Sequence, residues 1–394
     1  ASTRIPLLPH DFHPVLSRWW ETRFADSTHG ARVLPPTDAQ LEGWRAIRAG
    51  AHTLIAAPTG SGKTLAAFLW SIDRLASRPP PPERLRRCRV VYVSPMKALA
   101  VDVERNLRSP LVGIRHAATR LGLAEPEIAV AVRSGDTPAE ERRRFGRTPP
   151  DILITTPESL FLILTSQARE ALRGVETVIV DEVHAVAGTK RGAHLALSLE
   201  RLDALLERPA QRIGLSATVR PVEEVARFLG GPHPVEVVSP PAQKRVELEV
   251  VVPVEDLGEL GQVTGEVSGS AAGAEQRSSI WPHVEERIVD LVEAHRSTIV
   301  FANSRRLAER LCARLNEIHH ERVTGEQLPG PGEQRPPAQL MAQSGASRGV
   351  EGELARAHHG SVSKEQRAQI EEALKSGWLK AVVATSSLEL GIDM

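Results

Sequence analysis

This chain of 394 residues is poor in several residue types, and each scarcity excludes a class of protein. It contains only two cysteines, Cys88 and Cys312, which lie far apart and lack the spacing of metal ligands. A small disulfide-bonded secreted fold is therefore excluded, and a reducing cytoplasm is the expected setting. Aromatic residues make up only 4% of the chain, so its cores must consist of Leu, Val, Ile and Ala.

Excess charge and long apolar runs are also missing. Because 49 basic residues balance 49 acidic ones, a nucleic acid would have to bind in a local groove. No stretch reaches about 18 consecutive apolar residues, so no transmembrane helix is expected. The N-terminus, Ala1–Ile5, does not have the apolar core of a signal peptide. We therefore expect no membrane partner.

Short apolar, β-rich runs alternate with helical patterns along most of the chain. This alternation favours an α/β fold with parallel sheets that are covered by helices on both faces. The predicted elements of the first unit are strands Thr53–Ala56, Val90–Val93, Ile128–Val132, Ile152–Thr155, Thr177–Val180 and Arg212–Leu215, and helices Leu65–Ala76 and Gly192–Leu206. Those of a second unit are helices Val284–His295, Arg305–Asn316 and Lys364–Ser376, and strands Thr298–Phe301 and Lys380–Ala384.

Composition also suggests where the domains end. Residues 1–34 form an N-terminal extension, 35–240 a first domain, 241–280 a connection and 281–394 a second domain. The boundary is expected between Ser239 and Arg245, where a Pro-Pro pair follows a strand. Gly258–Ser279 is rich in Gly, Ser and Ala and is expected to be flexible, and residues 321–352 are expected to form an exposed insertion.

Residues 57–64, Ala-Pro-Thr-Gly-Ser-Gly-Lys-Thr, have the pattern of a phosphate-binding loop between a strand and a helix. Glycines allow such a loop to curl so that backbone N–H groups and a helix N-terminus face the phosphates of ATP. Lys63 can reach the β- and γ-phosphates, and the Thr64 hydroxyl can ligate Mg²⁺. The other predicted contacts of the nucleotide in this loop are Thr59, Gly60, Ser61 and Gly62. A chance glycine-rich loop is disfavoured because the flanking strand and helix are in place.

Two further signals concern the same site. Asp181 and Glu182 follow an apolar strand, and ligands bind at the carboxyl ends of parallel strands. Asp181 can hold Mg²⁺, and Glu182 can orient and activate the attacking water. Alone, such an acidic pair is usually a solvated turn. Gln40 lies upstream of the loop, and its amide suits the edge of adenine. An ordinary exposed glutamine without a ligand is an equally good interpretation of this residue.

Five further sequence motifs point to a particular protein family: Ser94–Asp102, Arg133–Thr137, Thr155–Leu160, Lys190–Leu195 and Ser387–Met394. With the phosphate loop and the acidic pair, they resemble the superfamily 2 helicases, and within them the large helicase-related (Lhr) family of bacteria. The resemblance implies two RecA-like domains of the P-loop NTPase class. It also implies that Gln40 reads adenine, that Asp393 belongs to the nucleotide site, and that His184, Ser216, Ala217 and Thr218 couple this site to the nucleic acid. The alternative roles are a helix N-cap for Ser216 or Thr218 and a structural hydrogen bond for His184.

The family also implies a nucleic-acid groove, in which a single strand is held mainly through its phosphates. The positions that match its contacts are Ser94, Lys97, Arg133, Ser134, Thr156 and Pro157 in the first domain, and Asn303, Ser304, Arg305, His359, Gly360, Thr385 and Ser386 in the second. For any one of them, ordinary loop polarity is an equally good explanation. The run Arg142–Arg144 is interpreted as a solvated helix face.

The resulting hypothesis is an ATP-dependent DNA helicase that moves 3′-to-5′ on single-stranded DNA and unwinds DNA or RNA:DNA duplexes, in DNA repair, at the nucleoid of a bacterial cytoplasm. Its cofactors are ATP and Mg²⁺. An RNA helicase and a non-enzymatic ATP-binding scaffold are the alternatives. The family's arginine-finger motif, which begins with Gln and carries spaced Arg residues, is not in the sequence. The second domain is therefore expected to be incomplete, and the chain to bind ATP but to turn it over poorly.

Overall fold

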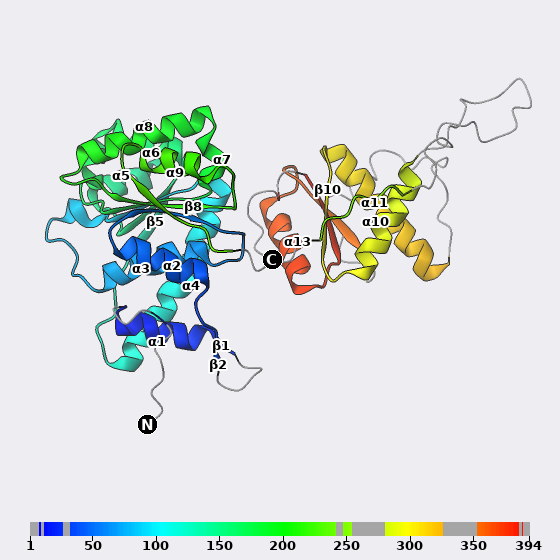
Figure 1. Ribbon diagram of the computed structural model, residues 1–394, viewed down its shortest axis with the longest axis horizontal. Helices are drawn as coiled ribbons and strands as arrows, with labels where there is room; N and C mark the ends of the chain where they lie inside the picture. The colour runs from blue at the N-terminus through cyan, green and yellow to red at the C-terminus, as the bar shows by residue number, and fades with distance from the viewer. Residues whose placement is uncertain are drawn as a thin grey trace, which may run out of the picture. The chain divides into compact units, whose positions relative to one another are not determined.

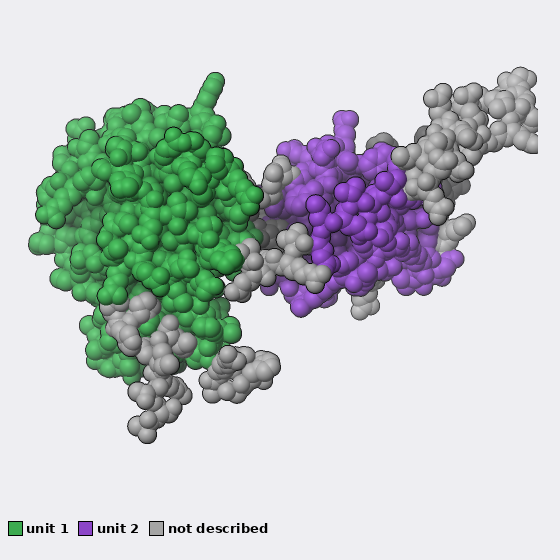
Figure 2. Space-filling view, viewed as in Figure 1, with its two compact units in different colours: residues 1–245 green, residues 246–394 purple. Residues whose placement is uncertain are grey.

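In the computed structural model, the chain divides into two compact units, residues 1–245 and 246–394, which are described separately (Figure 2). The structure describes residues 8, 12–26, 32–241, 247–253, 280–325, 353–385 and 388. The predicted flexible stretch Gly258–Ser279 lies outside the described residues, as does most of the predicted insertion.

The first unit is built around a seven-stranded parallel sheet of order β5-β6-β4-β7-β8-β3-β9 (Figure 1). The strands are β3 His52–Ala56, β4 Val90–Val93, β5 Val130–Arg133, β6 Ile152–Thr155, β7 Thr177–Val180, β8 Gln211–Ser216 and β9 Val235–Val238. The two short strands Ala25–Asp26 (β1) and Arg32–Val33 (β2) form a separate antiparallel pair. Five of the six predicted strands match within one residue at each end. The exception is β5, which begins at Val130 and not at Ile128.

Helices cover both faces of this sheet, as the near-continuous apolar strands require. One core lies between the sheet and helices α1 to α4, and the other between the sheet and helices α5 to α9 (Figure 1). The first set is α1 Pro14–Arg23, α2 Asp38–Arg48, α3 Lys63–Ala76 and α4 Lys97–Leu121. The second is α5 Ala139–Arg147, α6 Pro157–Leu164, α7 Val183–Ala187, α8 Lys190–Leu205 and α9 Val222–Gly230.

The N-terminal residues belong to the first core, although aromatic side chains are rare in the sequence. Trp20 of α1 packs edge-on against Trp44 of α2, with ring centroids 6.1 Å apart. Phe12 lies 5.1 Å from Trp44 and 6.0 Å from Trp70 of α3. Helix α1 is therefore an integral layer of the first unit.

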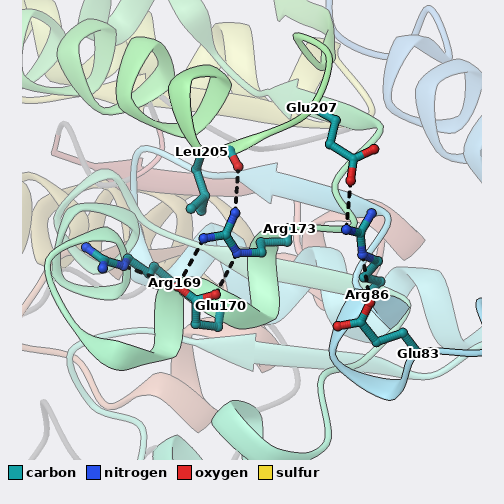
Figure 3. Close-up of polar contacts among 7 residues, drawn as sticks. All are labelled: Glu83, Arg86, Arg169, Glu170, Arg173, Leu205 and Glu207. Atoms are coloured by element: carbon teal, nitrogen blue, oxygen red, sulfur yellow. Dashed lines mark hydrogen bonds and ion pairs between the residues drawn. The ribbon is translucent and has the colours of Figure 1, made fainter.

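Exposed ion pairs connect the short 3₁₀ helices η1 (Arg84–Arg87) and η2 (Gln167–Leu172) to the end of α8 (Figure 3). Arg86 bonds to Glu83 and Glu207, and Arg173 bonds to Glu170 and to the carbonyl of Leu205. Since water and salt screen exposed ion pairs, these contacts orient surface segments more than they stabilise the fold.

The second unit contains a three-stranded parallel sheet of order β10-β12-β11. Its elements are α10 Trp281–Ala294, β10 Thr298–Phe301, α11 Arg305–Thr324, β11 Ala355–His358, α13 Lys364–Ser376 and β12 Ala381–Ala384. Helices α10 and α11 cover one face, and α13 covers the other. One prediction was wrong here, and one strand was missed. Helix α11 continues past Asn316 to Thr324, into the stretch assigned to the insertion, and β11 was not predicted.

Candidate functional site

The loop between β3 and α3 has the backbone shape that phosphate binding requires. Gly60 and Gly62 both have a φ of 77°, a conformation that residues with a Cβ rarely adopt. No side chain caps the N-terminus of α3, so its first N–H groups are not taken by a cap. The Ala57 N–H donates to the Ser216 carbonyl over 3.1 Å, which holds the loop against the end of β8.

Polar groups of this loop lack the partners that a bound triphosphate would supply. Lys63 is only 6% exposed, and its Nζ has one weak contact, 3.4 Å from the Pro58 carbonyl. The hydroxyl of Ser61 is buried without any hydrogen-bond partner. Since buried polar groups are normally paired, the loop fits the anionic oxygens of a nucleotide.

Gln40 lies against this loop, but inside the protein. It is 3% exposed, its Oε1 accepts from the Thr37 N–H at 2.9 Å, and its Nε2 donates to the Gly62 carbonyl at 3.2 Å. Thr37 in turn caps α2 and donates to the Ser61 carbonyl at 2.7 Å. One amide hydrogen and one lone pair of Gln40 therefore remain for an adenine edge. The predicted adenine contact also has a structural task, which is to fix the loop.

Asp181 and Glu182 stand at the carboxyl end of β7, beside the phosphate loop. Asp181 is 4% exposed, and its Oδ1 accepts the Glu182 N–H at 2.9 Å. Burial raises the pKa of Asp181 to about 6, and the Lys63 ammonium opposes this shift. The charges of Lys63 and Asp181 therefore interact, so the phosphate loop and the acidic pair belong to one site. A buried carboxylate is stabilised by a nearby cation, so Asp181 fits Mg²⁺. The Thr64 hydroxyl, in the first turn of α3, would be a second ligand of the same ion.

Glu182 is the one non-glycine residue with a positive φ among those the structure describes, with φ 44° and ψ 47°. Such a left-handed conformation costs about 1–2 kcal/mol in a residue with a Cβ. Strained backbone of this kind concentrates at functional sites, because the surrounding structure must hold it in place. The strain turns the chain sharply from β7 into α7, so the acidic pair lies at the edge of the sheet.

His184 lies between the acidic pair and the end of β8, with its Nδ1 3.4 Å from Oε2 of Glu182. Its Nδ1 accepts the Ala217 N–H at 3.3 Å and lies 3.2 Å from the Ser216 hydroxyl. Because the Ala217 N–H must donate, Nδ1 carries no proton, and the ring is neutral with its hydrogen on Nε2. Burial, and then the Lys63 ammonium, lower the pKa of His184 and keep it neutral.

Three of the four predicted coupling residues therefore lie in one hydrogen-bonded group, and Thr218 follows them on an exposed turn. The alternative role as a helix cap does not apply to Ser216 or Thr218, since α9 begins at Val222 with Pro221 at its N-cap.

The predicted nucleic-acid residues of the first unit lie at or after the carboxyl ends of β4, β5 and β6, which are neighbours on one side of the sheet. Their side chains differ in access. Ser94, Thr156 and Pro157 are buried, and Thr156 caps α6. Arg133 and Ser134 are partly exposed, but one terminal nitrogen of Arg133 is buried without a hydrogen-bond partner, and its guanidinium lies 5.1 Å from the centre of the Phe145 ring. A strand of nucleic acid at this edge would therefore meet backbone groups and Arg133 before the three buried side chains.

In the second unit, the described candidate residues follow the carboxyl ends of β10, β11 and β12. Arg305 begins α11 and donates to the Ser361 hydroxyl at 2.9 Å, which joins the loops after β10 and β11. Ser304 caps α11, and the Thr385 N–H donates to the carbonyl of His358.

The remaining candidate residues of this unit differ in access. His359 is buried, with Nε2 bonded to Glu309 and Nδ1 accepting from the Ser361 N–H. Asn303 and Gly360 are exposed. Ser386 and Asp393 lie outside the described residues, and for Lys97 only the backbone is described.

The sequence patterns missed three residues that hold these loops. Arg191 donates to the carbonyl of Pro95 at 2.8 Å and to Glu158 at 2.6 Å, so it ties two predicted nucleic-acid loops together. Arg142 donates to the carbonyls of Thr137 and Gly135 and is not merely part of a solvated face. Tyr92 donates to Asp181. Only Arg191 carried a signal, because it lies in one of the family motifs.

A cavity of about 430 Å³ lies at the amino ends of β4, β7 and β8, away from the phosphate loop. It is lined among others by Arg48, Arg74, Arg89 and Arg208, and it contains none of the predicted site residues. Within the described ranges, no cluster of three or more His, Cys, Asp or Glu side chains could bind a metal ion. No described helix combines the length and the apolar character needed to cross a bilayer.

The sequence profile of the DEAD/DEAH box helicases matches residues 37–226, which span the phosphate loop, the acidic pair and the coupling residues. The chain is 62% identical over 387 residues to the Lhr helicase/probable uracil glycosylase of Mycolicibacterium smegmatis, covering 97% of this chain. It is 54% identical over 403 residues to the Lhr helicase/uracil glycosylase of Escherichia coli, covering 98% of this chain. This chain belongs to the Lhr family of helicases.

The match to Lhr proteins concerns only part of their length. The chain covers 24% of the M. smegmatis relative and 25% of the E. coli relative. It covers 39% of the archaeal ATP-dependent helicase Lhr-Core of Methanothermobacter thermautotrophicus, to which it is 38% identical over 388 residues.

A solved structure of Lhr confirms the fold. The helicase Lhr of Mycobacterium smegmatis bound to single-stranded DNA and AMP-PNP superimposes with a TM-score of 0.72 at 59% identity, over 99% of this chain and 43% of that one. The DNA-bound helicase MrfA, at 21% identity and a TM-score of 0.66, shares the fold alone. The predicted α/β class with RecA-like parallel-sheet domains is thus confirmed.

Proposed function

We propose that this chain is the ATP-hydrolysing motor portion of a DNA helicase that uses ATP and Mg²⁺. The observation that carries the proposal is the convergence of a buried Lys63, a buried Asp181 and a strained Glu182 on one phosphate-type loop. A non-enzymatic nucleotide-binding scaffold would need the lysine but not the strained glutamate.

The residues divide the chemistry among them. Lys63, with the N–H groups of Gly60 to Thr64, holds the β- and γ-phosphates and offsets their charge. Glu182 orients the attacking water and takes up its proton as the water oxygen bonds to the γ-phosphorus. The bond between this phosphorus and the bridging oxygen of the β-phosphate breaks in the same step, so that ADP leaves and inorganic phosphate is formed. Thr64 and Asp181 would hold Mg²⁺, which when bound neutralises charge on the phosphates. His184 and Ser216 then transmit the change at the γ-phosphate to the loop after β8.

The nucleic acid is proposed to be single-stranded DNA, held by loops after β4, β5 and β6 in the first unit and after β10, β11 and β12 in the second. Support comes from the Lhr structure, which was solved with single-stranded DNA and an ATP analogue. We further propose 3′-to-5′ movement and unwinding of DNA or RNA:DNA duplexes. Since the two bacterial relatives carry uracil glycosylase in their names, DNA repair at the nucleoid is the proposed setting.

The test is strand displacement by the full-length protein on matched duplexes with either a 3′ or a 5′ single-stranded tail, made of DNA or of RNA. The proposal predicts ATP-dependent displacement from DNA with a 3′ tail and little from a 5′ tail. Phosphate contacts alone discriminate the sugars poorly, so an RNA helicase remains the alternative. More strand displacement from an RNA tail than from a DNA tail would favour it. Displacement without ATP hydrolysis would contradict the motor assignment.

A further inference from the structure

Tyr92 is the one tyrosine of the sequence, and it lies inside the first unit beside the acidic pair. It is on β4, where its register partners are Ile154 of β6 and Ile179 of β7. The side chain is fully buried. Its ring stacks on Phe68 of α3, with centroids 4.8 Å apart and an angle of 18°. The ring is therefore fixed between the sheet and the helix that follows the phosphate loop.

The Tyr92 hydroxyl donates a hydrogen bond to Oδ2 of Asp181. Burial, and then the Asp181 charge, raise the pKa of Tyr92 well above its ordinary value, so the hydroxyl keeps its proton and acts as the donor. The other oxygen of Asp181, Oδ1, accepts the Glu182 N–H. Both oxygens are thus held from the protein side, and each retains a lone pair for a further partner.

We propose that Tyr92 is a positioning residue that fixes the Asp181 carboxylate for the metal-bound nucleotide. This inference rests on the proposed function, in which Asp181 helps to hold Mg²⁺. A hydrogen bond from a second residue fixes the orientation of a metal-binding carboxylate, and loss of such a bond typically weakens metal binding or activity by about 10–100-fold. A tyrosine that only filled the core would tolerate the loss of its hydroxyl without this effect.

The geometry separates these two roles. The ring fills space between β4 and Phe68, and phenylalanine would fill the same space. Only the hydroxyl reaches Asp181, so Tyr92→Phe removes the contact with the carboxylate and keeps the packing. Val91, the preceding residue of β4, is also fully buried but belongs to the core on the other face of the sheet. Val91→Ala therefore serves as the matched control for a general weakening of this strand.

The experiment measures binding of a fluorescent, non-hydrolysable ATP analogue to the protein as a function of Mg²⁺ concentration, with EDTA as the metal-free baseline. For Tyr92→Phe we expect unchanged affinity in EDTA and a Mg²⁺ requirement raised about tenfold. Val91→Ala should keep the parental Mg²⁺ requirement. An unchanged requirement in Tyr92→Phe, or an equal rise in Val91→Ala, would overturn the proposal.

A double-mutant cycle with Asp181→Asn provides a second test, since Tyr92 is argued to act through Asp181. In the Asp181→Asn background, Tyr92→Phe should produce no further change in the Mg²⁺ requirement, and an additive change would contradict the proposed route. If the parent protein bound the analogue without any response to Mg²⁺, the proposed function would fail, and this inference with it. A parent that responds to Mg²⁺ while Tyr92→Phe matches it would remove only the role of Tyr92.

Discussion

Glu182 shows how one residue can carry both strain and chemistry. Its left-handed backbone places the carboxylate where β7 ends, and no glycine relieves that conformation. Glycine would remove the strain but also the carboxylate that is proposed to accept the proton from water. The strain therefore indicates that the carboxylate is needed at this position.

For Glu182→Gln we predict nearly unchanged affinity for ATP, because the amide keeps the shape of the side chain. ATP hydrolysis should fall by about 10²–10⁴-fold, the usual contribution of a general base. Single-turnover hydrolysis by the full-length protein with saturating single-stranded DNA measures the effect. Parental turnover in this variant would remove Glu182 from the proposed role.

At the same scale, the sequence predicted which loops meet but not how each side chain is used. The spacing of Lys63, Asp181 and Ser216 was enough to expect one site, because parallel strands bring their carboxyl ends to one edge. It did not show that Thr156 caps a helix or that the Gln40 amide fixes the phosphate loop. Short polar side chains compete between capping, turn and ligand roles, and only the fold decides among them.

Among the elements, helix α1 is one that the sequence patterns undervalued. Its contact with α4 is close: a Cβ at Gly113 of α4 would lie 2.5 Å from the indole ring of the buried Trp19. Helix propensity favours alanine over glycine by about 1 kcal/mol, but overpacking against a rigid ring costs about 1–3 kcal/mol. The cost of overpacking should exceed the gain in helix propensity, because Trp19 is enclosed and cannot move away.

We therefore predict that Gly113→Ala lowers the free energy of unfolding, as measured by urea denaturation. The matched control is Gly146→Ala in α5, where an added Cβ would meet no atom within 4 Å. Without an overlap, only propensity acts, and the control should be neutral or stabilised by up to about 1 kcal/mol. Equal stabilisation of both variants would show that α1 does not pack against α4 in this way.

The start of β3 is expected to give the first unit a pH-dependent stability. Nδ1 of His52 accepts the Arg212 N–H at 2.9 Å, and burial, followed by the Arg212 charge, lowers the pKa of His52 below its ordinary value of 6.5. The unfolded chain therefore binds this proton more readily than the folded one. The contribution of His52 to the free energy of unfolding is fully present above pH 6.5 and is lost as the pH falls through the lowered pKa.

Accordingly, His52→Asn should reduce the loss of unfolding free energy between about pH 7.5 and 5.5, because the Asn oxygen can accept the same N–H without titrating. Urea denaturation at several pH values measures this slope. The exposed His116→Asn on α4 serves as the control and should leave the slope unchanged. A slope in His52→Asn identical to that of the parent would contradict the assignment.

Element by element, apolar runs predicted β-strands well, because strands buried on both faces leave a continuous signal. They failed for β11, whose sequence Ala-Arg-Ala-His contains no such run. They also missed α4, where Pro110 interrupts an otherwise helical pattern and yet lies inside the helix. In both cases tertiary packing overrides a weak local preference.

On the scale of the whole molecule, two α/β units each present the carboxyl ends of parallel strands, and both predicted sets of loops lie at those ends. The chain represents about a quarter of the two bacterial Lhr proteins, so its residues account for a motor and not for every activity named in them. The proposed motor requires above all that the first unit binds ATP through the loop around Lys63.

Isothermal titration of the protein with AMP-PNP and Mg²⁺ tests this claim most directly. We predict binding at a single site, and at least about tenfold weaker binding, or about 1.4 kcal/mol, for Lys63→Ala. Lys375→Ala, which removes an exposed lysine from α13, should bind like the parent. Equal affinity of Lys63→Ala and the parent would contradict the account at its centre.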